Sequence, residues 1–507
     1  MIPVPSLNDL NLHLTLPALS LTVWACLLLL IDLWVPNTRK QTTAWLAAGG
    51  VVFAFVANAF LFNVNDDAFM GMFRADQFTA FLNIVILGTA FISILMSVDY
   101  LKRTKIERGE YYVLLLFSTS GMMFMAASND VIMVFVALEL LSIPLYVLSA
   151  FRAPELKSEE SGLKYFILGA FASAFFVYGA ALVYGATGTT NIPAMFDAVA
   201  LGLAEGGSVP VLLLLGAGLM LVGLGFKVAV VPFHMWTPDV YEGAPSPVTA
   251  FMSIGAKAGG FAALLRILAI GLPGLIVAGG DQTIASWQTI SWIIAAATMI
   301  IGNLAAIAQT NIKRMLAYSS IAHAGYIMMA VAAAGTAQPG LPEAAAQGAL
   351  FYLIAYMFTN MGAFAIAMAL EKDDGTGTNI EDFVGLSKSR PTLALMMAVF
   401  MLSLTGIPGT AGFLGKVFVF GPSLDAGLIA MAVIGVLTSI ASGYYYLRIV
   451  VNMYLREGAG DPAVGATPYL NWAAYACFAG TLILGIVPFL ATDLTSNVLM
   501  AASHMLP

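Results

Sequence analysis

Four ionisable side chains lie deep inside long apolar runs of this sequence: Glu139, Lys227, Lys257 and Lys416. A charged group near the centre of a bilayer is costly, so its presence there indicates a function such as moving protons. Glu139 is nine residues into its run, and no other carboxylate lies at such depth. If Glu139 approaches Lys227, the two groups titrate as a pair, and separating them releases a proton from the lysine. The alternative is a buried carboxylate that only fixes helix packing.

Two of the lysines lie next to residues that weaken a helix. Lys227 shortly precedes Pro232, and Lys416 follows the segment 406–415, which contains four glycines and Pro408. Proline removes a backbone donor and glycine weakens a turn, so we expect both helices to be broken. Broken helices occur inside membranes only where protein surrounds them or where they line a water-filled cavity. The alternative for each lysine, Lys257 included, is snorkelling, in which the long side chain carries the ammonium to the membrane surface.

Four further basic residues lie in apolar runs. His323 is in the middle of its run and has a side chain suited to passing protons, although a membrane histidine can also simply hydrogen-bond to a neighbouring helix. Lys164 is in the first turns of its run, where its position fits a relay residue and an interface anchor equally well. Arg266 and Arg448 are near the ends of their runs, and we interpret both as snorkelling residues.

The elements that carry these residues are predicted to cross a membrane. The chain has 507 residues, of which 60% are hydrophobic and only 10% are charged, whereas about 25% is usual for soluble proteins. The mean hydropathy is +0.90. This composition excludes a soluble multidomain protein, and no basic stripe with interleaved aromatic residues supports nucleic-acid binding.

A membrane-spanning helix needs about 20 mostly apolar residues, and fourteen segments meet this requirement. They are 14–35, 44–63, 76–98, 111–128, 130–151, 160–186, 209–231, 246–270, 285–307, 314–335, 346–370, 392–421, 427–454 and 468–492. Membrane-spanning β-strands are shorter and alternate in polarity. We therefore predict an all-α polytopic membrane protein with about fourteen spans.

The distribution of lysine and arginine predicts the orientation. The odd-numbered loops hold fourteen of the 21 basic residues, whereas the even-numbered loops and both termini hold one, Arg74. Because basic loops stay in the cytoplasm, we expect the odd loops there and both termini on the opposite side of the membrane.

The two broken lysine helices are five spans apart, so they must run in opposite directions. Such a pair at matching positions indicates an inverted repeat. We therefore predict three N-terminal spans in 1–110, inverted five-helix repeats in 111–272 and 284–456, and a C-terminal span in 457–507.

Cofactor motifs are lacking in the sequence. Cys26 and Cys477 form no CxxC pair, and the four histidines are scattered, so we expect neither an iron–sulfur cluster nor a metal site in this chain. Nor is there a nucleotide or redox motif to drive proton movement, and the driving reaction is therefore expected in another protein.

Several motifs resemble those of the antiporter-like subunits of respiratory complex I, and the resemblance covers essentially the whole chain. The motifs are the segments 223–239 (ending in PFHMWTPD), 241–257 (beginning YEGAPSPVTA), 309–323 (QTNIKR to SSIAH) and 406–416. The length, the lysine at 416 and the YEGAP run make the chain most similar to the N-type subunits of this family.

The resemblance implies a proton-translocating subunit in the membrane arm of an NADH–quinone oxidoreductase in the bacterial inner membrane. Its proton-relay residues would be Glu139, Lys227, Lys257 and Lys416, with Lys164 and His323 as further members. Flavin, iron–sulfur clusters and quinone would be held by other subunits, and the partners would be other membrane-arm subunits and the lipid bilayer. Two alternatives stay open: a subunit of a multisubunit cation/proton antiporter, and a membrane scaffold with inert ion pairs.

Overall fold

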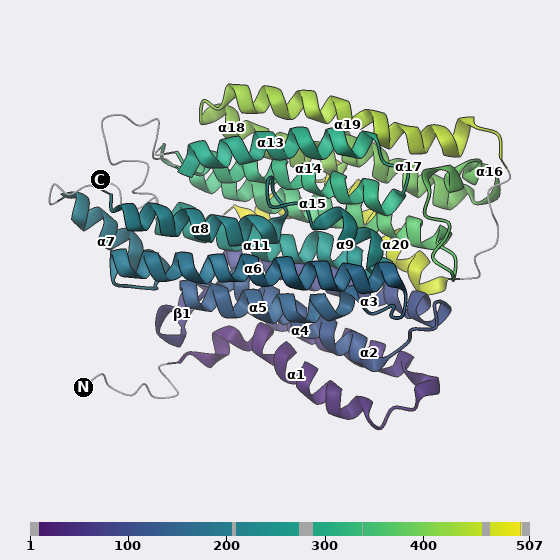
Figure 1. Cartoon of the computed structure of the whole chain (residues 1–507), viewed down its shortest axis with the longest axis horizontal. Coiled ribbons are helices and arrows are strands. Elements are labelled where there is room, and N and C mark those ends of the chain that lie inside the picture. The colour runs from purple at the N-terminus through teal and green to yellow at the C-terminus, as the bar shows by residue number, and fades with distance from the viewer. Residues whose placement is uncertain are drawn as a thin grey trace.

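A computed structural model of the chain describes residues 10–204, 209–272, 287–336, 338–458, 467–496 and 498. Long helices lie side by side and form a bundle (Figure 1). Thirteen helices of the described part are long and apolar enough to cross a membrane by length and composition. The all-α polytopic fold predicted from the sequence is confirmed.

The N-terminal part, up to residue 110, contains three long helices and a small hairpin. Its elements are η1 (Leu12–Thr15), α1 (Leu16–Asp32), η2 (Asn37–Arg39), α2 (Gln41–Phe60), β1 (Asp66–Ala68), η3 (Phe69–Gly71), β2 (Phe73–Ala75) and α3 (Gln77–Arg103). The strands β1 and β2 pair antiparallel, with Asp67 opposite Arg74.

The next part, up to residue 272, contains the first broken helix. Its elements are α4 (Gly109–Ala127), α5 (Val131–Ser149), α6 (Leu156–Thr187), α7 (Ile192–Ala204), α8 (Val211–Val228), α9 (Thr237–Gly243), α10 (Ser246–Phe251), η4 (Met252–Ala256), α11 (Lys257–Leu265) and η5 (Arg266–Gly271). The segments η4 and η5 are π-helical, and α10, η4, α11 and η5 form one continuous span.

The remainder contains the second broken helix and the C-terminal helices. Its elements are α13 (Trp287–Ile307), α14 (Ile312–Ala333), α15 (Leu341–Leu370), η6 (Ile380–Phe383), α16 (Leu386–Ser389), α17 (Pro391–Thr405), α18 (Ala411–Asp425), α19 (Ile429–Leu455), α20 (Pro468–Ile486) and α21 (Phe489–Thr495).

Both predicted helix breaks are confirmed. The helix α8 ends at Val228, and the chain re-forms a helix only at α9. The twelfth predicted span, 392–421, is two helices, α17 and α18, because Gly406 adopts a left-handed conformation (φ 93°) that ends α17. The other thirteen predicted spans each correspond to one of the candidate membrane helices.

Elements in even-numbered loops lie at one end of the bundle, and an element in an odd-numbered loop lies at the other end. The helix α7 and the strand β1 are at one end, and α16 is at the other (Figure 1). The sequence analysis missed α7 and the β1–β2 hairpin, because both are too short to resemble a span. The two inverted repeats remain a prediction, and the boundary predicted at 284 lies outside the described residues.

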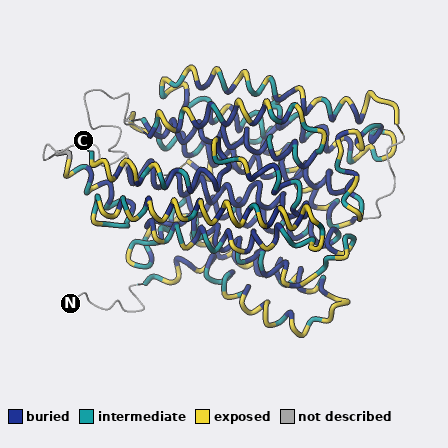
Figure 2. Tube along the Cα trace, viewed as in Figure 1, coloured by how far each residue is buried: buried dark blue, intermediate teal, exposed yellow. Residues whose placement is uncertain are grey.

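The core is formed by the span that carries Lys257, by α14, which carries His323, and by α15. The span 246–271 and the helices α14 and α15 are almost fully buried, whereas α1, α6 and α19 expose apolar faces at the periphery (Figure 2). Small residues allow close helix contacts in the core. A Cβ at Gly302 of α13, for example, would lie 2.7 Å from the backbone nitrogen of Ala322 in α14.

Candidate functional site

Lys227 lies in the last turn of α8, directly before the helix break. Its side chain is buried, and Nζ donates a hydrogen bond of 3.2 Å to the hydroxyl of Tyr165 on α6. The ring of Tyr165 stacks on Trp236 with 4.5 Å between the ring centroids, and the Trp236 indole donates to the carbonyl of Phe226. Tyr165, which is itself stacked on Trp236 after the break, therefore fixes the position of the ammonium.

Glu139 of α5 is close enough to Lys227 for their charges to interact, but the structure describes no ion pair between them. One carboxylate oxygen of Glu139 is buried and has no hydrogen-bond partner within the protein. A buried oxygen left without a partner is unfavourable. The role of Glu139 toward Lys227 stays a prediction.

Lys257 begins α11, directly after the π-helical turn η4, and is buried. Its Nζ donates to both the hydroxyl and the carbonyl of Ser320 on α14, each at 2.5 Å. Gly260, on the same face of α11, packs against the end of α8: a Cβ there would lie 3.4 Å from Cγ of Lys227. Lys257 therefore lies between the helix that carries Lys227 and a helix of the second predicted repeat.

His323 is buried on α14, three residues after Ser320. Its Nδ1 is 2.5 Å from the hydroxyl of Tyr352, its Nε2 is 3.1 Å from the hydroxyl of Tyr446, and its ring stacks on Tyr356 with centroids 4.7 Å apart. Both ring nitrogens therefore have partners that can either donate or accept a proton.

A small cavity of about 10 Å³ lies between His323 and the second helix break. Its lining includes His323, Thr359 and Ser403, together with Gly412 and Gly415 of α18. The Thr359 and Ser403 hydroxyls are 3.1 Å apart, and Ser403 accepts from the backbone nitrogen of Gly412. The cavity is about the size of one water molecule, and its few polar groups are the hydroxyls and the His323 ring.

Lys416 of α18 is buried beside this cavity and binds the end of α17. Its Nζ donates to the carbonyls of Leu404 (3.0 Å) and Thr405 (2.8 Å) and to the hydroxyl of Ser439 (2.7 Å). The last carbonyls of a helix lack intrahelical partners and carry partial negative charge. The break thus supplies the acceptors that a buried ammonium needs.

Snorkelling is excluded for the three central lysines, because each ammonium binds an acceptor inside the bundle. It is also wrong for Arg266, which is 2% exposed. The Arg266 guanidinium forms hydrogen bonds of 2.9 Å to both carboxylate oxygens of Asp76. The Arg448 guanidinium donates a hydrogen bond to the carbonyl of Gln309, which follows the end of α13.

Lys164 lies outside the row of buried ionisable residues that runs from Lys227 to Lys416. Its half-exposed side chain pairs with Glu160 and with Asp239 of α9, at 2.6 Å each. Arg314 of α14 binds Asp239 at 2.7 Å and Glu242 at 3.1 Å. Burial raises the pKa of Asp239, but the hydrogen bonds from Lys164 and Arg314 outweigh it, so the pKa is lowered from its ordinary value. This cluster holds α9 between α6 and α14.

The sequence analysis gave no role to the tyrosines, nor to Asp239 and Glu242 of α9, although α9 lies within the motifs that carry the family resemblance. Tyr165, Tyr352 and Tyr446 carry no charge at neutral pH and are ordinary in apolar helices, so composition gave no reason to select them. The one available signal was the spacing of Tyr352 and Tyr356, which are four residues apart and therefore share a helix face.

Comparisons with known proteins agree with this arrangement. The sequence model of a family described as "NADH:quinone oxidoreductase/Mrp antiporter, TM" matches residues 128–442, a range that contains all six predicted relay residues. Subunit N of NADH-quinone oxidoreductase from Trichlorobacter lovleyi is 45% identical over 95% of each chain. The corresponding protein of Chloroflexus aggregans is 45% identical over 95% of this chain and 96% of its own.

Solved structures show the same fold. A chain of respiratory complex I from Thermus thermophilus, with bound aureothin, is 34% identical and has a TM-score of 0.77 over 94% of this chain and 98% of that one. A chain of the Mrp complex from Dietzia sp. has a TM-score of 0.81 over 98% of each chain, but it is 24% identical and shows the fold alone. From the family match and the 45% identical relatives we conclude that this chain belongs to the NADH:quinone oxidoreductase/Mrp antiporter membrane family, among the N subunits of NADH-quinone oxidoreductase.

Proposed function

We propose that this chain is a proton-translocating membrane-arm subunit of an NADH-quinone oxidoreductase. The observation that carries the proposal is the row of buried ionisable residues Lys227, Lys257, His323 and Lys416, each of which is hydrogen-bonded inside the bundle. Buried ionisable groups arranged in sequence across a bundle are typical of proton relays. In this multi-pass protein of the bacterial inner membrane, both termini lie on the non-cytoplasmic side, as the distribution of basic residues indicates.

Each relay residue has a distinct role in the proposal. Protons enter from the cytoplasmic side and reach Lys227, whose charge Glu139 modulates. Lys257 passes them to Ser320 and so to the second half, where the tyrosines around His323 and the adjoining cavity lead to Lys416. Lys416 gates the exit, because its three acceptors surround the break between α17 and α18. Lys164 acts at the edge of this path, through Asp239.

The driving reaction lies in other subunits. We propose that this chain holds no flavin, iron–sulfur cluster or quinone, and that quinone reduction elsewhere in the complex changes the charge state of the row. Neighbouring membrane-arm subunits and lipid are the partners of the exposed apolar faces of the outer helices.

The test is proton pumping by the purified complex in proteoliposomes. Lys227→Ala and Lys416→Ala are each expected to lower the number of protons pumped per NADH oxidised. Lys388→Ala, which removes an exposed lysine on α16, is the matched control and should pump as the wild type does. Wild-type stoichiometry in both relay variants would refute the proposal, and sodium-dependent transport without NADH oxidation would favour an antiporter.

A further inference from the structure

The segment between α9 and α10 links the first helix break to the helix that carries Lys257. It consists of Ala244 and Pro245, both extended, and Ser246, the first residue of α10. Ala244 and Ser246 are each 1% exposed. We call residues 244–246 the linker. Since its position sets where α10 begins, it also affects where Lys257 lies relative to Lys227.

The helix α14 contacts the linker through a buried cation. Lys313, in the first turn of α14, is 5% exposed, and its Nζ donates a 2.7 Å hydrogen bond to the carbonyl of Ala244. The next residue, Arg314, binds Asp239 and Glu242 on α9. Thus two consecutive residues of α14 hold both α9 and the linker, on the helix that also presents Ser320 to Lys257.

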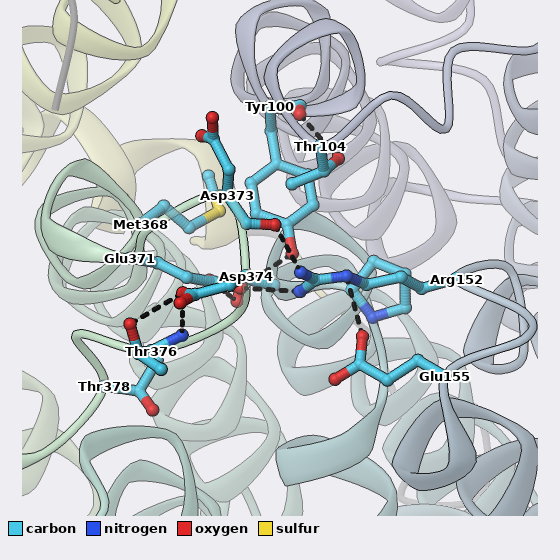
Figure 3. Close-up of polar contacts among 12 residues, drawn as sticks. Tyr100, Thr104, Arg152, Glu155, Met368, Glu371, Asp373, Asp374, Thr376 and Thr378 are labelled. Atoms are coloured by element: carbon cyan, nitrogen blue, oxygen red, sulfur yellow. Dashed lines mark hydrogen bonds and ion pairs between the residues drawn. The ribbon is translucent and has the colours of Figure 1, made fainter.

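The helix α15 contacts the linker through a buried anion, Glu371, which directly follows the end of the helix and is 2% exposed. The Glu371 carboxylate accepts from the hydroxyl of Ser246, from the hydroxyl of Tyr100 at 2.8 Å and from Arg152 at 3.4 Å. Figure 3 shows the Arg152 guanidinium between Glu371 and Glu155. Three donors from three different parts of the chain fix the position of this carboxylate.

We propose that Glu371 and Lys313 are positioning residues for proton transfer between Lys227 and Lys257. This inference rests on the proposed function. The two residues hold the linker from two helices of the second half: α14, which carries His323, and α15, which carries Tyr352 and Tyr356. Proton transfer requires donor and acceptor to approach within hydrogen-bond distance, so a displacement of about 1 Å is enough to slow it strongly.

The contact also gives the second half a way to affect the first. A rearrangement of α14 or α15 around His323 would be passed through Lys313 or Glu371 to the linker, and from there to Lys257.

The experiment uses the complete complex with substitutions on both sides of the contact. Ser246→Ala removes the linker hydroxyl and leaves the pair of Arg152 and Glu371 intact. Glu371→Gln combined with Arg152→Gln neutralises both charges, so no unpaired charge is left buried. Glu381→Gln, in an exposed pair with Arg456, is the matched control. The readouts are the amount of assembled complex and the protons pumped per NADH oxidised by the assembled fraction.

We expect Ser246→Ala and the double variant to assemble but to pump fewer protons per NADH, approaching the value of Lys227→Ala in the same assay. A merely structural cluster would change the amount of complex and leave the pumping ratio of the assembled fraction at the wild-type value. That result in Ser246→Ala, with pumping lost in Lys227→Ala, overturns this inference alone. Wild-type pumping in Lys227→Ala overturns the proposed function as well.

Discussion

Removing one partner of the buried pair of Arg266 and Asp76 should be among the most destabilising single substitutions in the bundle. Arg266 begins η5, which continues the helix that carries Lys257, and its guanidinium also donates to the hydroxyl of Thr79 and the carbonyl of Ala126. The side chains of Arg266 and Asp76 are only 3% and 14% exposed. We consider the substitution Asp76→Asn, which removes the charge but keeps an oxygen that can cap α3, as Asp76 does through the backbone nitrogen of Thr79.

The expected loss follows from what the substitution leaves behind. Breaking a buried ion pair by removing one partner typically costs about 3–5 kcal/mol, because the remaining charge is buried without compensation. The retained cap and the remaining acceptors of Arg266 place Asp76→Asn near the lower end, at about 3 kcal/mol. Asp76→Ala also loses the cap and should cost about 1 kcal/mol more.

The assay is unfolding of the chain by SDS in mixed micelles, which gives the free energy of unfolding relative to the wild type. Asp67→Asn is the matched control, since Asp67 pairs with Arg74 in the nearby hairpin, with side chains 38% and 27% exposed. An exposed pair is worth about 0–1 kcal/mol. If Asp76→Asn destabilises no more than Asp67→Asn does, the reasoning from burial is refuted. The double variant Asp76→Leu with Arg266→Met should recover most of the loss.

Two further predictions concern the contacts around the relay. Gly260→Ala places a Cβ 2.6 Å from Cγ1 of Val228. It should destabilise the chain by about 1–2 kcal/mol in the same assay, although alanine is the better helix former. The control Gly218→Ala has open space around it and should be neutral or stabilising; equal effects of the two substitutions would contradict this prediction. Because the pKa of Asp239 is lowered from its ordinary value of 3.8, its ionised form stabilises the fold above that value, and the contribution is lost as pH falls through the lowered pKa. The difference in unfolding free energy between wild type and Asp239→Asn should therefore stay constant from about pH 8 to pH 5 and shrink only below about pH 4; a difference that disappears near pH 6 would exclude this assignment.

The membrane spans and the buried row of charges could be predicted from the sequence, because both depend on local properties. A run of apolar residues identifies a span by its length, and a charge in its middle is costly in any fold. The breaks near Lys227 and Lys416 were predicted for the same reason, since proline and glycine act on the helix that contains them.

Residues near span ends could not be judged in this way, because their burial depends on how several helices pack together. Arg266 is buried against Asp76, which comes from a helix 190 positions earlier in the chain. Glu371 is likewise buried by α3, α10 and the segment after α5. Lys164 shows the converse: its position left two roles open, and the structure places it in a half-exposed cluster.

The π-helical turn η4 sets how the side chains after it are rotated relative to those before it. A π-helical turn contains one residue more than an α-helical turn, and such turns are frequent at functional sites. Without that extra residue, every side chain after η4 would be rotated by about 100° relative to those before it. Ser246 could then face Glu371, or Lys257 could face Ser320, but a regular α-helix would not allow both. The additional residue in η4 thus sets the rotational phase that lets one helix meet two partners on different sides of the bundle.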